Sequence, residues 1–234
     1  MSRYADVAAY ILAGGASSRM GQDKGLIEIG GEPLVVWTAQ LVRPLVDSVT
    51  VVGAPGTYRR FGLASIRDKV PGLSRVPAFA GPLAGIVTAL SSSKRTWNLI
   101  LACDLPYLST EWINVLLARA LKSGGQAFLP CTSRGMEPLA GVYRKDASEE
   151  LARAFKEGVR KVTDALARIS VETVSGEDFG NEDESGLALR NMNTPEDFRE
   201  AKDWWAVKQS LKGAAIKDLK RQVVKKRRAV RRNK

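Results

Sequence analysis

Two short segments combine residue types that could bind phosphates and a metal ion. The first, residues 12–24, reads LAGGASSRMGQDK and directly follows an apolar run. Gly14 and Gly15 let the backbone turn sharply and approach a ligand, while Arg19 and Lys24 supply positive charge for phosphate oxygens. The spacing fits neither GxxxxGK[ST] nor GxGxxG. A plain glycine-rich turn is the alternative, but the two cations at its mouth favour a phosphate site.

The second segment places a carboxylate at the end of an apolar strand. Residues 99–106 read LILACDLP, so Asp104 follows the run and Pro106 then interrupts the chain. In an open α/β sheet, ligands bind beyond the carboxyl ends of the strands, which puts Asp104 near the first segment. A carboxylate there could hold Mg²⁺ together with phosphates and water. An Asp that caps the next turn is the alternative, and the two segments together favour the metal site.

The composition excludes several other kinds of chemistry. The chain has no histidine, which rules out Ser-His-Asp hydrolysis, His-ligated zinc and HExxH proteolysis. A metal must then be held by oxygen, which favours magnesium or manganese. Cys103 and Cys131 lie in or beside apolar runs, so we expect two buried thiols and a reducing compartment. With no apolar segment of about 18 residues and no signal-peptide pattern, we expect a cytoplasmic protein without a membrane span.

The positive charge is concentrated at the C-terminus. The chain carries a net charge of +11, yet residues 212–234 hold eleven Lys or Arg and one acid, Asp218, and so contribute +10. The body is therefore nearly neutral, which argues against nucleic-acid binding by the folded part. We predict one domain over residues 1–211 and a basic tail over 212–234. The tail is either a basic amphipathic helix or a disordered arm.

The apolar runs alternate with helical patterns along the body. This rhythm is typical of an α/β fold with a mostly parallel sheet and helices on both faces. Strands are predicted at residues 7–13, 48–52, 64–67, 97–103, 127–130, 139–143, 171–174 and 187–190, and helices at 33–42, 82–90, 110–122, 147–157, 162–169 and 194–208.

The ordered set of motifs resembles the molybdenum cofactor guanylyltransferases. The stretch LAGGASSRMGQDKGLIEIGGEPL alone would indicate only the broader nucleotidyltransferase superfamily. The resemblance spans about residues 7–208, and its further motifs are Arg67-Asp68, GPLAG at 81–85, CDLPYL at 103–108 and NMNTPED at 191–197.

The resemblance implies a Rossmann-like nucleotidyltransferase fold that binds GTP and Mg²⁺ and attaches GMP to the terminal phosphate of the molybdenum-bound pterin. Molybdoenzymes or cofactor chaperones would be its protein partners. By motif match, GTP is bound by Leu12, Ala13, Gly14, Gly15, Lys24, Asp68 and Asp104, the metal by Asp104, and the pterin side by Arg160 and Lys161. Asn191 and Asn193 are further candidates for the pterin side, because their amides could bind phosphate or the water ligands of the metal. Arg19, Lys24 and Asp104 would be the catalytic residues. The Gly14-Gly15 pair is typical of guanylyl enzymes, whereas cytidylyl relatives typically carry Ala-Gly.

Some residues depart from the family pattern or have a purely structural interpretation. Gly53 stands where some relatives carry Asn, and Glu137 where some carry His. Thr194, Pro195 and Asp197 form a near capping box, which explains those residues but leaves the two neighbouring Asn side chains open for substrate. The alternative functions are a molybdopterin cytidylyltransferase, a sugar-phosphate nucleotidyltransferase, or a protein that binds nucleic acid or a membrane surface through its tail.

Overall fold

The computed structural model describes residues 3–13, 23–76, 80–175, 178–179, 187–208 and 210. Within them, eight strands form one mixed sheet in the order β10-β7-β9-β6-β1-β4-β5, with β8 paired to β7. These strands are β1 (Tyr4–Leu12), β4 (Val46–Val52), β5 (Ala64–Ile66), β6 (Trp97–Ala102), β7 (Ala127–Thr132), β8 (Gly135–Met136), β9 (Ala140–Arg144) and β10 (Val171–Ser175). The short strands β2 (Glu28–Ile29) and β3 (Glu32–Pro33) form a separate antiparallel hairpin that the sequence did not predict.

The centre of the sheet is parallel, as the sequence predicts. β1 pairs in parallel with β4 and β6, and β4 pairs in parallel with β5. β9 lies antiparallel between β6 and β7, and β10 is parallel to β7. β1 is central and buried on both faces, which explains its unbroken apolar run. The carboxyl ends of β5, β4, β1 and β6 therefore lie in a row along one edge of the sheet.

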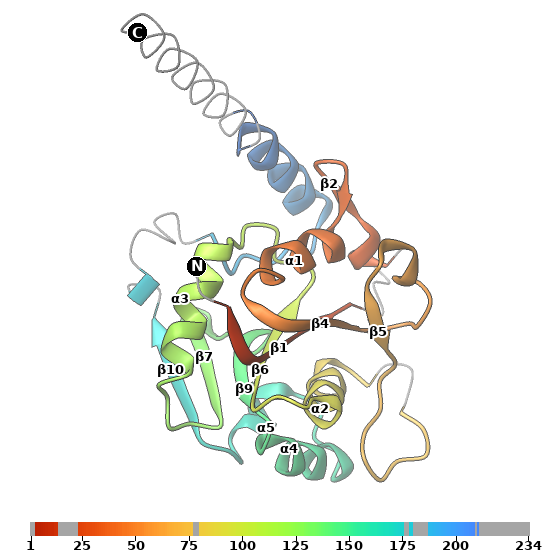
Figure 1. The fold of residues 1–234 in the computed structure, drawn as a ribbon, viewed down its shortest axis with the longest axis vertical. Helices are drawn as coiled ribbons and strands as arrows, with labels where there is room; N and C mark the ends of the chain where they lie inside the picture. Colours follow the sequence, from red (N-terminus) through yellow and green to blue (C-terminus); the bar gives the residue numbers. More distant parts are fainter. Residues whose placement is uncertain are drawn as a thin grey trace, which may run out of the picture.

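Helices cover both faces of the sheet (Figure 1). On one face, α1 (Leu34–Val42) and α3 (Thr110–Ala120) contribute to a core cluster with β1, β4, β6 and β9. On the other face, α2 (Pro82–Ser92), α4 (Ala147–Lys156) and α5 (Val162–Leu166) form a second cluster. This arrangement confirms the predicted fold class. None of the described helices is both long and apolar enough to cross a lipid bilayer.

One predicted strand is wrong. Residues 187–190 form a turn and no strand, although Ala188 and Leu189 are buried. Their side chains join the core cluster that includes α3 and Phe179. A run of three apolar residues, here Leu187 to Leu189, can be buried in a strand or in a turn, and periodicity cannot distinguish the two. The last predicted helix is confirmed over residues 195–208, whereas the predicted tail lies outside the described residues.

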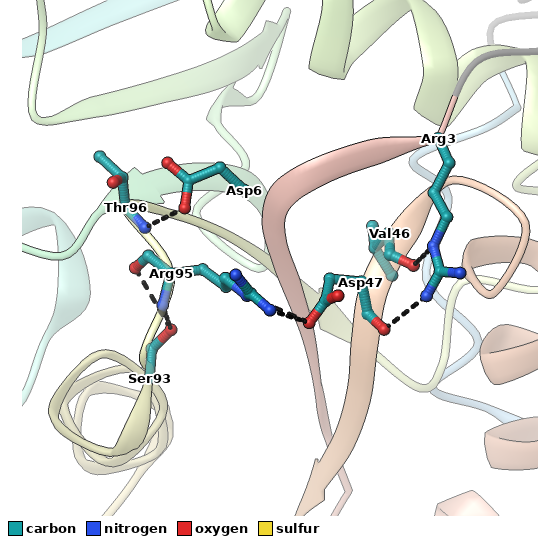
Figure 2. Close-up of polar contacts among 7 residues, drawn as sticks. All are labelled: Arg3, Asp6, Val46, Asp47, Ser93, Arg95 and Thr96. Atoms are coloured by element: carbon teal, nitrogen blue, oxygen red, sulfur yellow. Dashed lines mark hydrogen bonds and ion pairs between the residues drawn. The ribbon is translucent and has the colours of Figure 1, made fainter.

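The amino ends of the parallel strands are joined by a polar cluster (Figure 2). Arg95 donates from Nε and Nη2 to Asp47 Oδ2 at 3.1 and 2.8 Å. Arg3 donates to the first two carbonyl oxygens of β4 at 3.0 and 2.8 Å. The main-chain N–H of Thr96 donates to Asp6 Oδ1 at 3.1 Å. These bonds connect the starts of β1, β4 and β6 at the edge opposite the carboxyl ends.

Candidate functional site

Three side chains that lie far apart in the sequence meet at the carboxyl edge. Lys24 begins the short 3₁₀ helix η1 (Lys24–Leu26), which follows the glycine-rich segment. Its Nζ donates to Asp104 Oδ2 at 3.0 Å and to Asn193 Oδ1 at 2.6 Å. The Lys24 and Asp104 side chains are 22% and 17% exposed, so the ion pair is shielded but still reachable from solvent. The structure thus brings together three of the residues that the sequence predicts for the site.

The segment after β6 is held from two sides. The N–H of Cys103 donates to the carbonyl oxygen of Leu12 at 3.3 Å, which carries the β1–β6 pairing one residue beyond β6. The N–H of Met192 donates to the carbonyl oxygen of Asp104 at 2.9 Å. Trp205 Nε1 donates to the carbonyl oxygen of Pro106 at 3.0 Å. Residues near the C-terminal end of the described chain therefore fix the loop that carries Asp104.

The capping box predicted at residues 194–197 is present. Asp197 N–H donates to Thr194 Oγ1 at 3.1 Å, and Thr194 N–H donates to Asp197 Oδ2 at 2.9 Å. The same Asp197 oxygen also accepts from the N–H of Asn193 at 3.0 Å. These bonds, together with the Asp197 link to Arg190, lower the pKa of the Asp197 carboxyl. The cap fixes the backbone of Asn193, while its side chain stays directed to Lys24.

The end of β1 lies so close to Gly53 that there is no room for a side chain at that position. The N–H of Ala13 donates to the carbonyl oxygen of Val52 at 3.0 Å, so the chain continues beside β4. A Cβ on Gly53 would lie 2.0 Å from the carbonyl oxygen of Ala13, a distance that forces something to move. Glycine is required here because the two backbones approach closely. Leu12 and Ala13 lie at the predicted position, whereas Gly14, Gly15 and Arg19 lie outside the described residues.

Asp68 adds a second carboxylate two residues beyond β5. Its surface is exposed, yet the surrounding protein atoms partly desolvate the carboxyl and raise its pKa. No hydrogen bond or ion pair joins its side chain to another described residue. Asp68 follows the last strand of the row β6-β1-β4-β5, whereas Asp104 follows the first. The two carboxylates therefore lie toward opposite ends of this stretch of the edge.

The predicted pterin-side residues are not all brought together. Arg160 Nη1 donates to the carbonyl oxygens of Phe155 and Val159 at 2.8 and 2.9 Å, and its guanidinium lies over the Phe155 ring. Lys161 Nζ lies 4.0 Å from Asp164 Oδ1. These are local contacts at the end of α4 and the start of α5. Neither side chain contacts the Lys24 cluster.

The other predicted side chains differ in their surroundings. Asn191 is half-buried, and its amide forms no hydrogen bond within the described residues. Cys103 is a buried thiol, as predicted, and burial raises its pKa. Cys131 is half-buried, so the expectation of two buried thiols is wrong for it. It is the last residue but one of β7, where the strand leaves the core.

The donor set is compatible with Mg²⁺ bound through substrate. The described residues contain no group of three or more Asp, Glu, Cys or His that could enclose a metal ion. Asp104 Oδ1 has no hydrogen-bond partner among them, whereas Oδ2 is bonded to Lys24. Mg²⁺ is usually held by one or two carboxylates, with phosphate oxygens and water completing its shell. One free carboxylate oxygen beside the Lys24 ammonium fits that pattern.

Comparison with known proteins identifies the family. Residues 9–170 match the model of the MobA-like NTP transferase domain. The chain belongs to this family. It is 35% identical to a protein named probable molybdenum cofactor guanylyltransferase from Nostoc sp., over 82% of this chain and 89% of that protein. A molybdenum cofactor guanylyltransferase from Pseudomonas putida is 34% identical over 80% of this chain and 92% of its own length.

Solved structures support the same placement. Molybdopterin-guanine dinucleotide biosynthesis protein A from Archaeoglobus fulgidus has a TM-score of 0.73 and 26% identity, covering 85% of this chain and 98% of its own. A 2-C-methyl-D-erythritol 4-phosphate cytidylyltransferase from Thermus thermophilus has a TM-score of 0.61 and 18% identity, covering 86% and 99%, and shares the fold alone. As a member of the MobA-like family, the chain is a nucleotidyltransferase of molybdenum cofactor biosynthesis, and the resemblance seen in its motifs is confirmed.

Two residues of the site were not anticipated from the sequence. Asp23 caps η1, because its Oδ1 accepts from the N–H of Gly25 at 2.9 Å. Tyr58 donates its hydroxyl proton to Asp23 Oδ2 at 2.6 Å. An Asp two residues before a glycine is a recognisable turn signal that could have identified the cap. Tyr58 gives no such signal, since it lies 35 positions away in a loop after β4.

Proposed function

We propose that this member of the MobA-like family transfers GMP from GTP to the terminal phosphate of the molybdenum-bound pterin cofactor. An oxygen of the acceptor phosphate attacks the α-phosphorus of GTP and forms a new P–O bond. The bond from that phosphorus to the α,β-bridging oxygen breaks, and pyrophosphate leaves with the electron pair. The product is molybdopterin guanine dinucleotide. The observation that carries this proposal is the contact of Lys24 with Asp104 at the carboxyl edge of the sheet.

The side chains present suit a reaction between two anions. The acceptor is a phosphate monoester that is already ionised at neutral pH, so no general base is needed. A chain without histidine can therefore perform this step. What the reaction requires is alignment of the two phosphates and neutralisation of their charge. Lys24 is suited to hold the GTP phosphates, and Arg19 is assigned the same task from its place in the glycine-rich segment.

Asp104 is the residue we assign to Mg²⁺. Its free oxygen Oδ1 would hold the ion, while Oδ2 keeps Lys24 within the same site. When bound, Mg²⁺ would supply positive charge to the α-phosphate and to the leaving pyrophosphate. Asn193 supports this arrangement because its Oδ1 accepts from Lys24 at 2.6 Å. Asn193 therefore orients the ammonium group and retains an amide N–H₂ that can donate to substrate.

The order of strands suggests how the two substrates divide the edge. We assign the guanine nucleotide to Leu12, Ala13, Gly14 and Gly15 after β1, with Asp68 after β5 on the same side. We assign the acceptor to the side of Asn191 and Asn193. The free amide of Asn191 supports that assignment. Arg160 and Lys161 are included as exposed cations near the end of α4, where they could meet an acidic acceptor.

A reconstituted assay tests the proposed function. Purified protein is mixed with GTP, Mg²⁺ and molybdenum cofactor, and the guanine dinucleotide product is measured by mass spectrometry alongside released pyrophosphate. We expect both products in equal amounts and only when the cofactor is present. Pyrophosphate release with a sugar phosphate in place of the cofactor would support the sugar-phosphate alternative and overturn the proposal. A Lys24→Ala sample, with the same fold, controls for contaminating activity.

Its cellular setting belongs to the same proposal. We infer a cytoplasmic enzyme that passes its product to molybdoenzymes or to chaperones that carry the cofactor. Residues 1–211 would form the catalytic unit, and the basic segment 212–234 would not take part in the chemistry. The near-neutral charge of the body supports this division, because +10 of the net +11 comes from the last 23 residues. The body gives no support to a nucleic-acid-binding function.

A further inference from the structure

Tyr58 is a buried tyrosine whose hydroxyl has a single described partner. Its side chain is 0% exposed, and its hydroxyl donates to Asp23 Oδ2 at 2.6 Å. Burial, followed by the bond to Asp23, strongly raises the pKa of the Tyr58 hydroxyl, so it remains a donor. A buried hydroxyl costs free energy unless it is hydrogen-bonded. A phenylalanine would fill the same space and would need no hydrogen-bond partner. The bond to Asp23 is therefore the described interaction that explains why a tyrosine stands at this position.

Asp23 connects this bond to the catalytic lysine. Its Oδ2 accepts from Tyr58, while its Oδ1 accepts from the N–H of Gly25 at 2.9 Å. Both carboxylate oxygens of Asp23 are therefore hydrogen-bonded. Asp23 is the N-cap of η1, so these bonds fix the backbone next to Lys24, the first residue of that helix. With the turn fixed in this way, the Lys24 ammonium lies against Asp104 and Asn193. Without the bond from Tyr58, the Asp23 carboxylate keeps only its local bond to Gly25.

The ring of Tyr58 packs against the end of β1, which directly precedes the glycine-rich segment. It belongs to the core cluster that contains Ala13 and Cys103. A Cβ on Gly53 would lie 3.0 Å from Tyr58 Cε2 and 2.0 Å from the Ala13 carbonyl oxygen, so the ring, Gly53 and the end of β1 are in close contact. Tyr58 therefore packs against the residues at the end of β1 and bonds to Asp23 with its hydroxyl. These two points border the glycine-rich segment.

We propose that Tyr58 is a positioning residue of the nucleotide site, which fixes Lys24 for the triphosphate by holding Asp23. The inference rests on the proposed function in that it takes a nucleoside triphosphate as the ligand. It does not depend on which base is bound, because the contact it organises is with phosphate. A hydrogen bond to a charged group contributes more than one between neutral groups. Loss of the bond from Tyr58 to Asp23 should therefore weaken binding of the triphosphate by roughly tenfold.

The test compares two tyrosine-to-phenylalanine variants. Tyr58→Phe removes only the hydroxyl at the site. Tyr4→Phe is the control, because Tyr4 donates to Asn114 Oδ1 at 3.1 Å from the amino end of the same strand β1. Binding of GTP, CTP and guanosine is measured by calorimetry for each variant, with thermal unfolding to verify the fold. We expect Tyr58→Phe to weaken both triphosphates by a similar factor, about tenfold, and to leave guanosine unchanged. Tyr4→Phe should leave all three affinities unchanged.

A double-mutant cycle distinguishes positioning from general support of the core. If the hydroxyl acts through Asp23, then Tyr58→Phe should have no further effect on triphosphate binding in an Asp23→Ala background. Equal loss for guanosine and GTP, or full additivity with Asp23→Ala, would overturn the proposal. If Tyr58→Phe does not fold, Asp23→Ala alone must still weaken the binding of GTP and CTP and leave the binding of guanosine unchanged; otherwise the proposal fails. The proposed function is tested separately, by the ratio of kcat/KM for GTP to that for CTP. Because Tyr58→Phe should weaken binding of both triphosphates equally, it would not change this ratio.

Discussion

The two edges of the central sheet use the same residue types in opposite ways. At the amino edge, Arg95 holds Asp47 with two hydrogen bonds, and Arg3 donates to main-chain carbonyls (Figure 2). At the carboxyl edge, the side-chain ammonium of Lys24 donates to two side chains and to no described main-chain atom. The bonds of Arg3 and Arg95 go to residues of β4 and hold that strand in place. Lys24, Asp104 and Asn193 all lie outside the strands, so the bonds between their side chains can be exchanged for bonds to a ligand.

The carboxylates show the same contrast. Asp6 at the amino edge is bonded to Thr96, and that interaction lowers its pKa. Asp68 at the carboxyl edge has no described partner, and partial desolvation by the surrounding protein atoms raises its pKa. A desolvated carboxylate without a partner is unfavourable for the folded state and is typical of functional sites. The comparison indicates that the amino edge stabilises the fold, while the carboxyl edge retains the free groups to which we assign the substrates.

The largest effect is expected from Asp104→Asn. The change keeps the shape of the side chain but removes the charge that we assign to Mg²⁺, so kcat should fall by about a hundredfold or more. Unfolding temperature and circular dichroism should stay close to wild type. Asp47→Asn is the control from the other edge, where loss of the Arg95 ion pair should lower stability slightly and leave kcat unchanged. Equal kcat for the two variants would break the comparison between the edges.

A smaller and more selective effect is expected from Lys24→Ala. Loss of the ammonium should raise the KM for GTP and lower kcat, each by about tenfold, because a charged hydrogen bond to phosphate is lost. Guanosine has no phosphates and should bind to the variant as it does to wild type. Calorimetric titration of both ligands checks this. If the variant loses affinity for guanosine as well, Lys24 shapes the loop rather than binding phosphate.

The two unlike aspartates predict opposite pH dependences of stability. Asp6, with a pKa below its usual value near 3.8, stabilises the fold above that value, and this contribution is lost as pH falls through the lowered pKa. Asp68, with a raised pKa, contributes most below its usual value near 3.8, and its contribution is lost as pH rises through the raised pKa. Urea unfolding of Asp6→Asn and Asp68→Asn over this acidic range measures both. Asp6→Asn should lose less stability than wild type as the pH falls, and Asp68→Asn should lose less than wild type as the pH rises. For each variant, the difference in unfolding free energy from wild type is plotted against pH; slopes of the same sign for the two variants would contradict the assignment.

The smallest effect is expected from removing the basic tail. Truncation after Ser210 deletes almost all of the net positive charge and no residue assigned to the site. Turnover with GTP and molybdenum cofactor should remain unchanged. Steady-state kinetics of the truncated and full chains provide the comparison. A large fall in kcat would show that the catalytic unit extends beyond residue 211.

The sequence predicts the parts of the fold and site that have a local signal. The apolar run before Asp104 placed that residue at a strand end, and Thr-Pro-x-Asp identified the helix cap beside Asn193. The strand predicted at residues 187–190 is wrong because the buried side chains of Ala188 and Leu189 belong to a turn that packs against the core. Such a short run carries no information about the element that covers it.

The tertiary contacts could not be predicted in the same way. Tyr58 reaches Asp23 across 35 positions, and nothing in its own neighbourhood indicates a polar partner. The need for Gly53 arises from the approach of Ala13, which depends on the pairing of β1 with β4. The antiparallel direction of β9 could not be predicted either, because the apolar pattern of a strand is the same whichever way the strand runs in the sheet. Local patterns specify elements, whereas partners depend on how those elements pack.

The most direct test of the account is the nucleotide preference. Guanine presents an N1–H and an exocyclic amine as donors, and main-chain carbonyls at the end of β1 are suited to accept from them. A site built for these donors rejects a base that leaves its acceptors buried and unpaired, at about 1–3 kcal/mol for each group. The measurement is the ratio of kcat/KM for GTP to that for CTP with one pterin acceptor. We predict a ratio of at least about tenfold in favour of GTP; a ratio near one, or one that favours CTP, would contradict the assignment as a guanylyltransferase.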